Sequence, residues 1–208
     1  QLPLFQIKAG KSINFDHCYP RKAFDKQSMM WDLSYFKYYF LKLAKIPFDE
    51  QLLENDYHTL TDFLLSTNCN YFLYRDFQSR NIMIKNHQVY FIDYQGGRKG
   101  ALQYDVASLL FDAKANIPNN VRSDLLKFYI EQLKLHNIPT DAFHDFVYGY
   151  VLIRIMQAMG AYGFRGFYEK KTHFLLSIPY ALKNLRWLLD HADLPVKLPT
   201  LFNVLDQI

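Results

Sequence analysis

Residues 71–93 carry the sequence YFLYRDFQSRNIMIKNHQVYFID, in which three short oxygen-bearing side chains lie at the ends of apolar runs. Asp76 is followed five positions later by Asn81, and Asp93 comes directly after the apolar run 89–92. Runs of β-branched and aromatic residues separated by polar turn residues predict strands and a hairpin. We therefore expect a strand, a loop that holds Asp76 and Asn81, and a hairpin that returns Asp93 to that loop.

The order Asp, Asn and Asp is typical of the catalytic loop and metal site of phosphotransferases. A carboxylate must accept the proton of the attacking hydroxyl, and Mg²⁺ on the phosphates needs hard oxygen ligands. We assign the first role to Asp76 and the second to Asn81 and Asp93. Turn formation or helix capping explains any one of these residues alone, but it explains the set of three less well.

The stretch from Tyr71 to about Pro118 resembles the C-terminal lobe of the aminoglycoside phosphotransferase (choline kinase-like) superfamily. Within that superfamily it is most similar to bacterial kinases that phosphorylate N-acetylmuramate or N-acetylglucosamine at the anomeric hydroxyl. The resemblance is carried by Tyr74-Arg75-Asp76-Phe77, Arg80-Asn81-Ile82-Met83, Ile92-Asp93-Tyr94-Gln95 and Gln103 to Leu110. Asp followed by an aromatic residue and Gln resembles these sugar kinases, whereas protein kinases normally carry Asp-Phe-Gly. One departure is Tyr74, which stands where the family usually has His.

The resemblance also implies roles for residues around the loop. Asp105 matches an Asp that braces the catalytic loop backbone in the wider kinase fold, so we expect it to be structural. Arg75, Arg80 and Gln95 are candidate contacts to phosphate or acceptor, although an ion pair within the protein would account for either arginine at least as well. The implied cofactors are ATP and Mg²⁺.

A glycine-rich segment, residues 96–100, follows Asp93 almost directly and also contains Arg98 and Lys99. It is either a flexible loop at the mouth of the site, in which one of these cations neutralises phosphate charge, or a solvated surface loop. The residue pattern leaves both interpretations open.

Outside the hairpin, apolar residues recur with helical spacing. Helices are expected over 28–43, 49–66, 104–115, 119–133, 140–161, 167–176 and 179–191. The expected fold class is α+β and mainly helical: a protein kinase-like C-terminal lobe over residues 1–193, followed by a tail or linker over 194–208. Neither a glycine-rich phosphate loop nor a lysine-bearing strand precedes Asp76, and the chain begins with Gln. We therefore expect the N-terminal lobe of a kinase to be absent and the chain by itself to be inactive or nearly so.

The composition agrees with a cytoplasmic enzyme. A net charge of +4 is spread along the chain without a basic block, which argues against nucleic acid or a membrane surface as partner. Cys18 and Cys69 lack the spacing of a metal site or a disulfide framework, so reduced thiols are expected. Neither a signal-peptide pattern nor a membrane-spanning stretch is expected.

Together these observations predict an ATP- and Mg²⁺-dependent kinase that transfers the γ-phosphoryl group to a hydroxyl of a small molecule, most simply a cell-wall amino sugar. Its partners would be ATP and that acceptor. An aminoglycoside, choline or homoserine acceptor stays open, because one scaffold hosts many substrates. A non-catalytic kinase-like binding module is a further alternative, and the presence of all three catalytic oxygens argues against it.

Overall fold

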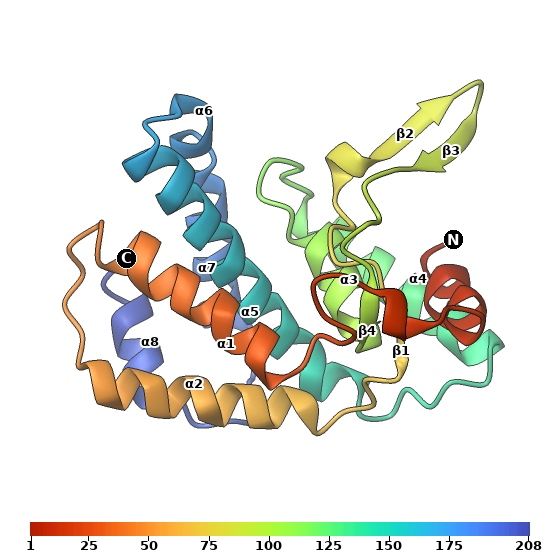
Figure 1. The fold of residues 1–208 in the computed structure, drawn as a ribbon, viewed down its shortest axis with the longest axis horizontal. Coiled ribbons are helices and arrows are strands. Elements are labelled where there is room, and N and C mark those ends of the chain that lie inside the picture. Colours follow the sequence, from red (N-terminus) through yellow and green to blue (C-terminus); the bar gives the residue numbers. More distant parts are fainter. The chain divides into compact units, whose positions relative to one another are not determined.

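The computed structural model describes all of residues 1–208 and divides the chain into two compact units (Figure 1). Unit 1 consists of Gln1–Asp25 and Thr67–Val147, and unit 2 consists of Lys26–Ser66 and Tyr148–Ile208. Helices dominate, and the few strands form two small sheets. The expected class, α+β and mainly helical, is confirmed, while the kinase-like character of the fold stays a prediction. None of the helices is both long enough and apolar enough to cross a membrane.

The strands of unit 1 form two antiparallel pairs. They are β1 (Tyr71–Leu73) with β4 (Arg98–Gly100), and β2 (Ile82–Lys85) with β3 (Gln88–Phe91). The β2–β3 hairpin closes through Asn86 and His87, which have φ angles of 50° and 59°. Two-residue hairpin turns favour positive φ at both positions, and Asn tolerates that conformation better than most residues. The strand, loop and hairpin expected from residues 71–93 are thus confirmed.

The glycine-rich segment 96–100 is not the loop that was expected, because its second half is strand β4. Gly100 permits a close approach to β1, since a Cβ there would lie 2.4 Å from Cδ1 of Leu73. Arg98 is buried, and its Nε donates to the carbonyl of Gly96 at 2.9 Å. Arg98 is therefore not an exposed cation at the mouth of a site, and the expectation for that residue was wrong.

Helix α3 supplies the centre of the core of unit 1. The helical elements of this unit are η1 (Leu4–Lys8), η2 (Ala9–Lys11), η3 (Phe15–His17), η5 (Ser79–Asn81), α3 (Leu102–Leu110), α4 (Asn119–Leu135) and the start of α5 (Phe143–Tyr162). Tyr104 and Ala107 of α3 are 1% exposed, and Val106 and Leu110 are 3% exposed. The helix is shorter than the predicted range 104–115. Because nearly all of its faces are covered, a polar side chain on it must find its partners inside the protein.

Unit 2 is built from helices alone. Its elements are α1 (Lys26–Phe36), the π-helix η4 (Lys37–Leu41), α2 (Glu50–Leu65), the rest of α5, the π-helix η6 (Gly163–Tyr168), α6 (Thr172–Leu175), α7 (Ile178–His191) and α8 (Pro199–Leu205). Helix α2 begins after Asp49, whose side chain accepts the backbone N–H of Leu52 at 2.8 Å. The helix expected over 167–176 was wrong, because Lys170 adopts a left-handed φ of 61° and separates η6 from α6.

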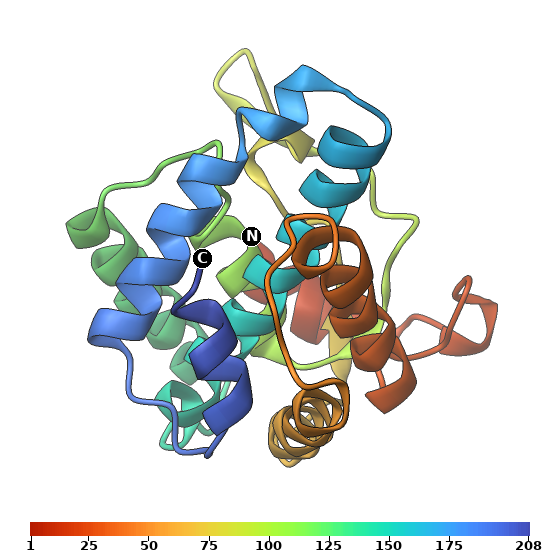
Figure 2. The same ribbon diagram turned by 90° about the vertical axis from the view of Figure 1, so that its left-hand side faces the viewer.

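The last residues of the chain, expected to be a tail or linker, contain the packed helix α8. This helix contacts α2 within unit 2 (Figure 2). Leu201 and Leu205 are completely buried, and Val204 is 1% exposed. The backbone N–H of Leu201 donates to Oδ2 of Asp56 at 2.8 Å. A buried carboxylate of α2 thus accepts a backbone N–H of the first turn of α8 that has no partner within its own helix. Burial of one apolar face makes this segment part of the unit.

Candidate active site

Asp105, in the first turn of α3, holds the backbone of the loop between β1 and β2. Its carboxylate is fully buried and accepts the backbone N–H groups of Tyr74 at 2.8 Å and Arg75 at 3.0 Å. Arg75 has a φ of 80°, a conformation that residues other than glycine rarely adopt. Because the two hydrogen bonds stabilise this turn, Asp105 lies where a loop-bracing residue has to lie.

Two further residues complete the surroundings of Asp105, and neither was predicted from the sequence. Gln6 donates through Nε2 to Oδ2 of Asp105 at 3.3 Å and to the carbonyl of Leu102 at 3.1 Å. The hydroxyl of Tyr129 in turn donates to Oε1 of Gln6. Burial raises the pKa of Asp105 to about 7, and the hydrogen bonds that the carboxylate accepts oppose this rise. No local pattern marks Gln6 or Tyr129, because each meets its partners only through the fold.

Asn81, at the end of η5, joins the other two residues expected to be catalytic. Its Nδ2 donates to the backbone carbonyl of Asp76 at 2.9 Å and to Oδ2 of Asp93 at 3.2 Å. Asn81 is 6% exposed, whereas Asp76 and Asp93 are partly open to solvent. The structure therefore brings the three residues together and leaves both carboxylates within reach of a ligand.

The residues after β3 shape the edge of this site. Asp93 has a φ of 70°, and its Oδ1 accepts Nε2 of Gln95 at 2.8 Å. A Cβ added to Gly96 would lie 3.6 Å from Oδ2 of Asp76, so glycine leaves that side of the carboxylate uncovered. Gln95, expected as a contact to phosphate or acceptor, contacts the Asp93 carboxylate.

The donor set fits Mg²⁺. Asp93 offers carboxylate oxygens, and Asn81 offers Oδ1 because its nitrogen makes both hydrogen bonds described above. The structure contains no group of three or more His, Cys, Asp or Glu side chains placed to hold a metal ion. Mg²⁺ usually binds through one or two carboxylates together with substrate phosphates and water. The residues present thus suit a cation shared with phosphate better than a closed protein cage.

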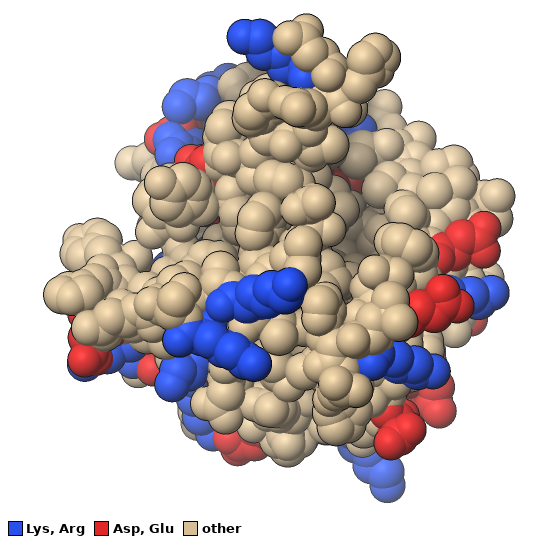
Figure 3. Space-filling view, turned by 90° about the vertical axis from the view of Figure 1, so that its right-hand side faces the viewer, with Lys and Arg blue, Asp and Glu red and all other residues tan.

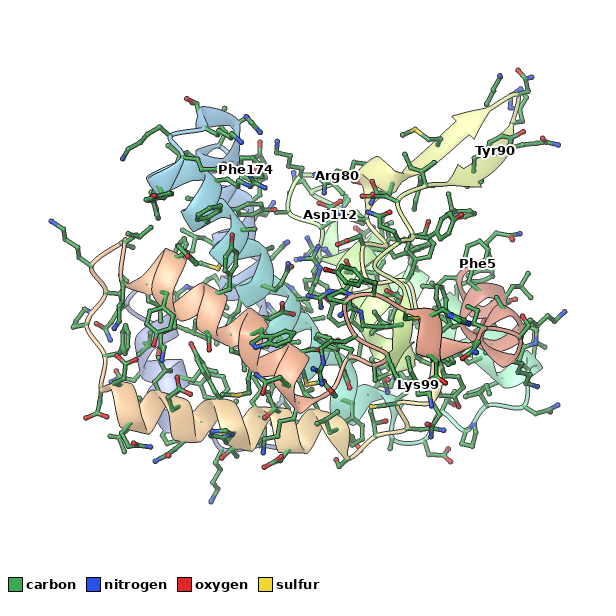
Figure 4. All side chains as sticks on the ribbon, viewed as in Figure 1. Phe5, Arg80, Tyr90, Lys99, Asp112 and Phe174 are labelled. Carbon is green, nitrogen blue, oxygen red and sulfur yellow. The ribbon has the colours of Figure 1, made fainter.

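Arg75 and Arg80, expected as phosphate contacts or ion-pair partners, lie in different surroundings. Nη1 of Arg75 donates to the hydroxyl of Tyr104 at 2.6 Å, and its guanidinium lies 5.2 Å from the centroid of that ring. These contacts favour packing within unit 1. Arg80 is exposed on η5 beside Asp112 (Figure 4), which accepts the backbone N–H of Ser79 at 3.0 Å. Of these two arginines, Arg80 is therefore the one whose side chain is exposed to a ligand.

Charged side chains do not merge into a basic surface on the face drawn in Figure 3. Lys and Arg lie in small groups among Asp, Glu and broad uncharged areas. The β2–β3 hairpin carries exposed apolar side chains, among them Ile84, which is 77% exposed, and Tyr90, which is 48% exposed (Figure 4).

No protein-family model matches the chain. It is similar to an N-acetylmuramate/N-acetylglucosamine kinase of Neisseria meningitidis serogroup B, with 28% identity over 128 residues. The match covers 59% of this chain and 38% of the relative, so the chain spans less than half the length of that kinase. The similarity indicates a relationship to a kinase.

Proposed function

We propose that this chain carries the phosphoryl-transfer site of an ATP- and Mg²⁺-dependent kinase that acts on a hydroxyl of a cell-wall amino sugar. One observation carries the proposal. The side-chain amide of Asn81 donates one hydrogen bond to the backbone carbonyl of Asp76 and another to the carboxylate of Asp93. Three residues expected to act together in phosphoryl transfer lie together, and Asp105 braces the backbone of the loop that carries Asp76 and Asn81.

Asp76 has the role of proton acceptor. The acceptor hydroxyl oxygen forms a bond to the γ-phosphorus of ATP, the bond from that phosphorus to the β–γ bridging oxygen breaks, and ADP leaves. The hydroxyl proton passes to the carboxylate of Asp76. The absence of a side chain at Gly96 keeps one side of this carboxylate open, so a hydroxyl can approach it. Catalysis of this kind depends on positioning and on charge neutralisation rather than on covalent chemistry of the protein.

Asn81 and Asp93 would hold Mg²⁺. When bound, the ion supplies positive charge that neutralises the phosphate oxygens. Asn81 keeps its Oδ1 directed away from the Asp76 carbonyl, because rotating the amide would lose the hydrogen bond to that carbonyl. Gln95 fixes the Asp93 carboxylate from one side at 2.8 Å. Arg80 would contact a phosphate, and its exposure on the same loop supports this role.

Two observations support an amino sugar as acceptor. Asp93-Tyr94-Gln95 resembles the corresponding segment of amino-sugar kinases, and the Neisseria relative is named as a kinase of N-acetylmuramate and N-acetylglucosamine. A polycationic acceptor would need a cluster of exposed carboxylates, whereas this chain is mildly basic and its sequence has no run of carboxylates near the motif.

The test is acceptor-dependent ADP release by the complete gene product that carries this chain. N-acetylmuramate, N-acetylglucosamine, kanamycin, choline and homoserine are compared, in wild type, Asp76→Asn and the control Asp124→Asn. Asp124 is an exposed carboxylate on α4. We expect release with an amino sugar, a fall of about 10²- to 10⁴-fold in Asp76→Asn, and no change in the control.

Each other outcome has a definite meaning. Release with kanamycin, choline or homoserine alone keeps the kinase and overturns the amino sugar. ATP binding without release for any acceptor favours a binding module. Turnover that is unaffected by Asp76→Asn refutes the mechanism.

A further inference from the structure

Tyr74 connects the residue that braces the loop to the segment that carries the expected metal ligand. Its backbone N–H donates to Oδ2 of Asp105, and its hydroxyl donates to the backbone carbonyl of Ile92, each at 2.8 Å. Ile92 directly precedes Asp93. The backbone of Tyr74 is thus hydrogen-bonded to α3, and its side chain is hydrogen-bonded to the residue that follows strand β3.

The carbonyl of Ile92 matters because of the backbone conformation that follows it. Asp93 has a φ of 70°, which a residue other than glycine keeps only where its surroundings determine it. The Ile92 carbonyl and the Asp93 N–H belong to the same planar peptide group. A hydrogen bond to the carbonyl therefore limits rotation of that plane and sets the direction in which the Asp93 side chain leaves the backbone. On its other side, the N–H of Ile92 donates to the carbonyl of Asn81 at 3.1 Å.

The phenol of Tyr74 is itself held in place. Tyr74 is 4% exposed, and its ring lies 5.4 Å from that of Phe77 and 6.2 Å from that of Phe5 between ring centroids. Phe5 belongs to η1, far away in the chain (Figure 4). Burial, with the nearby carboxylates of Asp93 and Asp105, raises the pKa of the Tyr74 hydroxyl, so it stays protonated and remains a donor at neutral pH.

We propose that Tyr74 is a positioning residue for the cation site, in which its hydroxyl holds the Ile92–Asp93 peptide so that the Asp93 carboxylate faces Asn81. This inference rests on the proposed function, because it takes Asp93 and Asn81 as cation ligands. A phenylalanine at position 74 would keep the ring contacts and the N–H bond to Asp105 and remove only the hydroxyl. The Asp93 carboxylate would then sample other directions. Binding of a cation would have to order this side chain, and the entropy lost would weaken the affinity for the cation.

Tyr74→Phe is tested against Tyr57→Phe as a matched control. Tyr57 is completely buried in unit 2, and its hydroxyl has no hydrogen-bond partner. Mn²⁺ is the probe, and its dissociation constant from the complete gene product is measured by electron paramagnetic resonance of the free ion. Urea unfolding and amide hydrogen exchange over residues 92–95 are measured on the same variants.

We expect Tyr74→Phe to raise the Mn²⁺ dissociation constant by about 3- to 10-fold, as loss of one buried hydrogen bond does, and to speed exchange at the Asp93 amide. Tyr57→Phe should change neither. A merely structural role would lower the urea midpoint and leave the dissociation constant within about twofold of wild type, and that result overturns the inference. Asp93→Asn separates the two proposals. If it fails to weaken Mn²⁺ binding, the cation site of the proposed function is wrong, whatever Tyr74→Phe does.

Discussion

The most demanding prediction about stability concerns Asp105, whose carboxylate braces the backbone of the loop between β1 and β2. Replacing Asp105 by Ala removes the acceptor of two buried backbone donors, the N–H groups of Tyr74 and Arg75. It also removes one of the two acceptors of Gln6, whose other hydrogen bond, to the carbonyl of Leu102, remains. Because Asp105 has no exposed surface, water cannot take its place without a rearrangement of the core.

The size of the effect follows from these contacts. A buried donor left without a partner costs about 1–3 kcal/mol, so two of them give about 2–6 kcal/mol for Asp105→Ala. Asp105→Asn keeps one carbonyl oxygen as acceptor but turns an NH₂ group toward one of the donors, so we expect a smaller loss of about 1–3 kcal/mol at pH 4, where the wild-type carboxyl is protonated. Either loss is large beside the roughly 5–15 kcal/mol that stabilises a domain.

The pH dependence has a definite sign. Burial raises the pKa of Asp105 in the folded chain from 3.8 to about 7, so the folded state binds this proton more tightly than the unfolded state does. The stability that this proton contributes is complete below pH 3.8 and is lost as the pH rises through about 7. Relative to Asp105→Asn, which cannot ionise, wild type should therefore lose up to roughly 4 kcal/mol of unfolding free energy between pH 4 and pH 7.5, at about 1.4 kcal/mol per pKa unit.

The assay is urea unfolding followed by far-ultraviolet circular dichroism from pH 4 to pH 8. Circular dichroism is chosen because unit 1, which contains Asp105, holds neither of the two tryptophans, Trp31 and Trp187. Asp124→Asn, an exposed carboxylate on α4, is the control and should behave as wild type. A loss below about 1 kcal/mol for Asp105→Ala, or an advantage of wild type over Asp105→Asn that grows with pH, would refute the reasoning.

Three other changes test the packing and the charge interactions of unit 2. Leu201→Ala, in the buried face of α8, should lower the unfolding free energy by about 2–5 kcal/mol in urea; a loss within about 0.5 kcal/mol of zero would make α8 a loose tail after all. Gly163→Ala would place a Cβ 2.0 Å from the carbonyl oxygen of Tyr39, so the melting temperature should fall clearly, and an unchanged value would contradict the close approach of η6 to η4. Lys37→Met removes the ammonium group whose hydrogen bond is the main cause lowering the pKa of Glu50 to about 2. Carbon-13 NMR should then find that pKa shifted upward. A lowered carboxyl pKa adds stability above its unfolded value of 4.5 that is lost as the pH falls toward 2, so the variant should lose less stability on acidification than wild type.

Local chemistry was sufficient to predict the elements whose signals lie within a few residues. The hairpin follows from two short β-type runs joined by Asn86 and His87, and α2 follows from its helical spacing, with Asp49 capping its start. Strand β4 was missed because glycine and charged residues carry no strand signal by themselves. Arg98–Gly100 becomes a strand only because β1 offers it backbone partners, and Gly100 lets the two strands approach.

The sequence by itself determined the order and spacing of Asp76, Asn81 and Asp93, and with them the loop and hairpin that bring the three residues together. Turn and strand preferences act over a few residues, so such a motif can be recognised without the rest of the chain. Only the tertiary structure decided which groups hold that motif in place. Gln6 reaches a carboxylate 99 positions away, and the hydroxyl of Tyr74 reaches the carbonyl of Ile92, directly after strand β3. The physical reason is that a buried polar group requires a hydrogen-bond partner wherever the folded chain supplies one, and no local pattern records that choice.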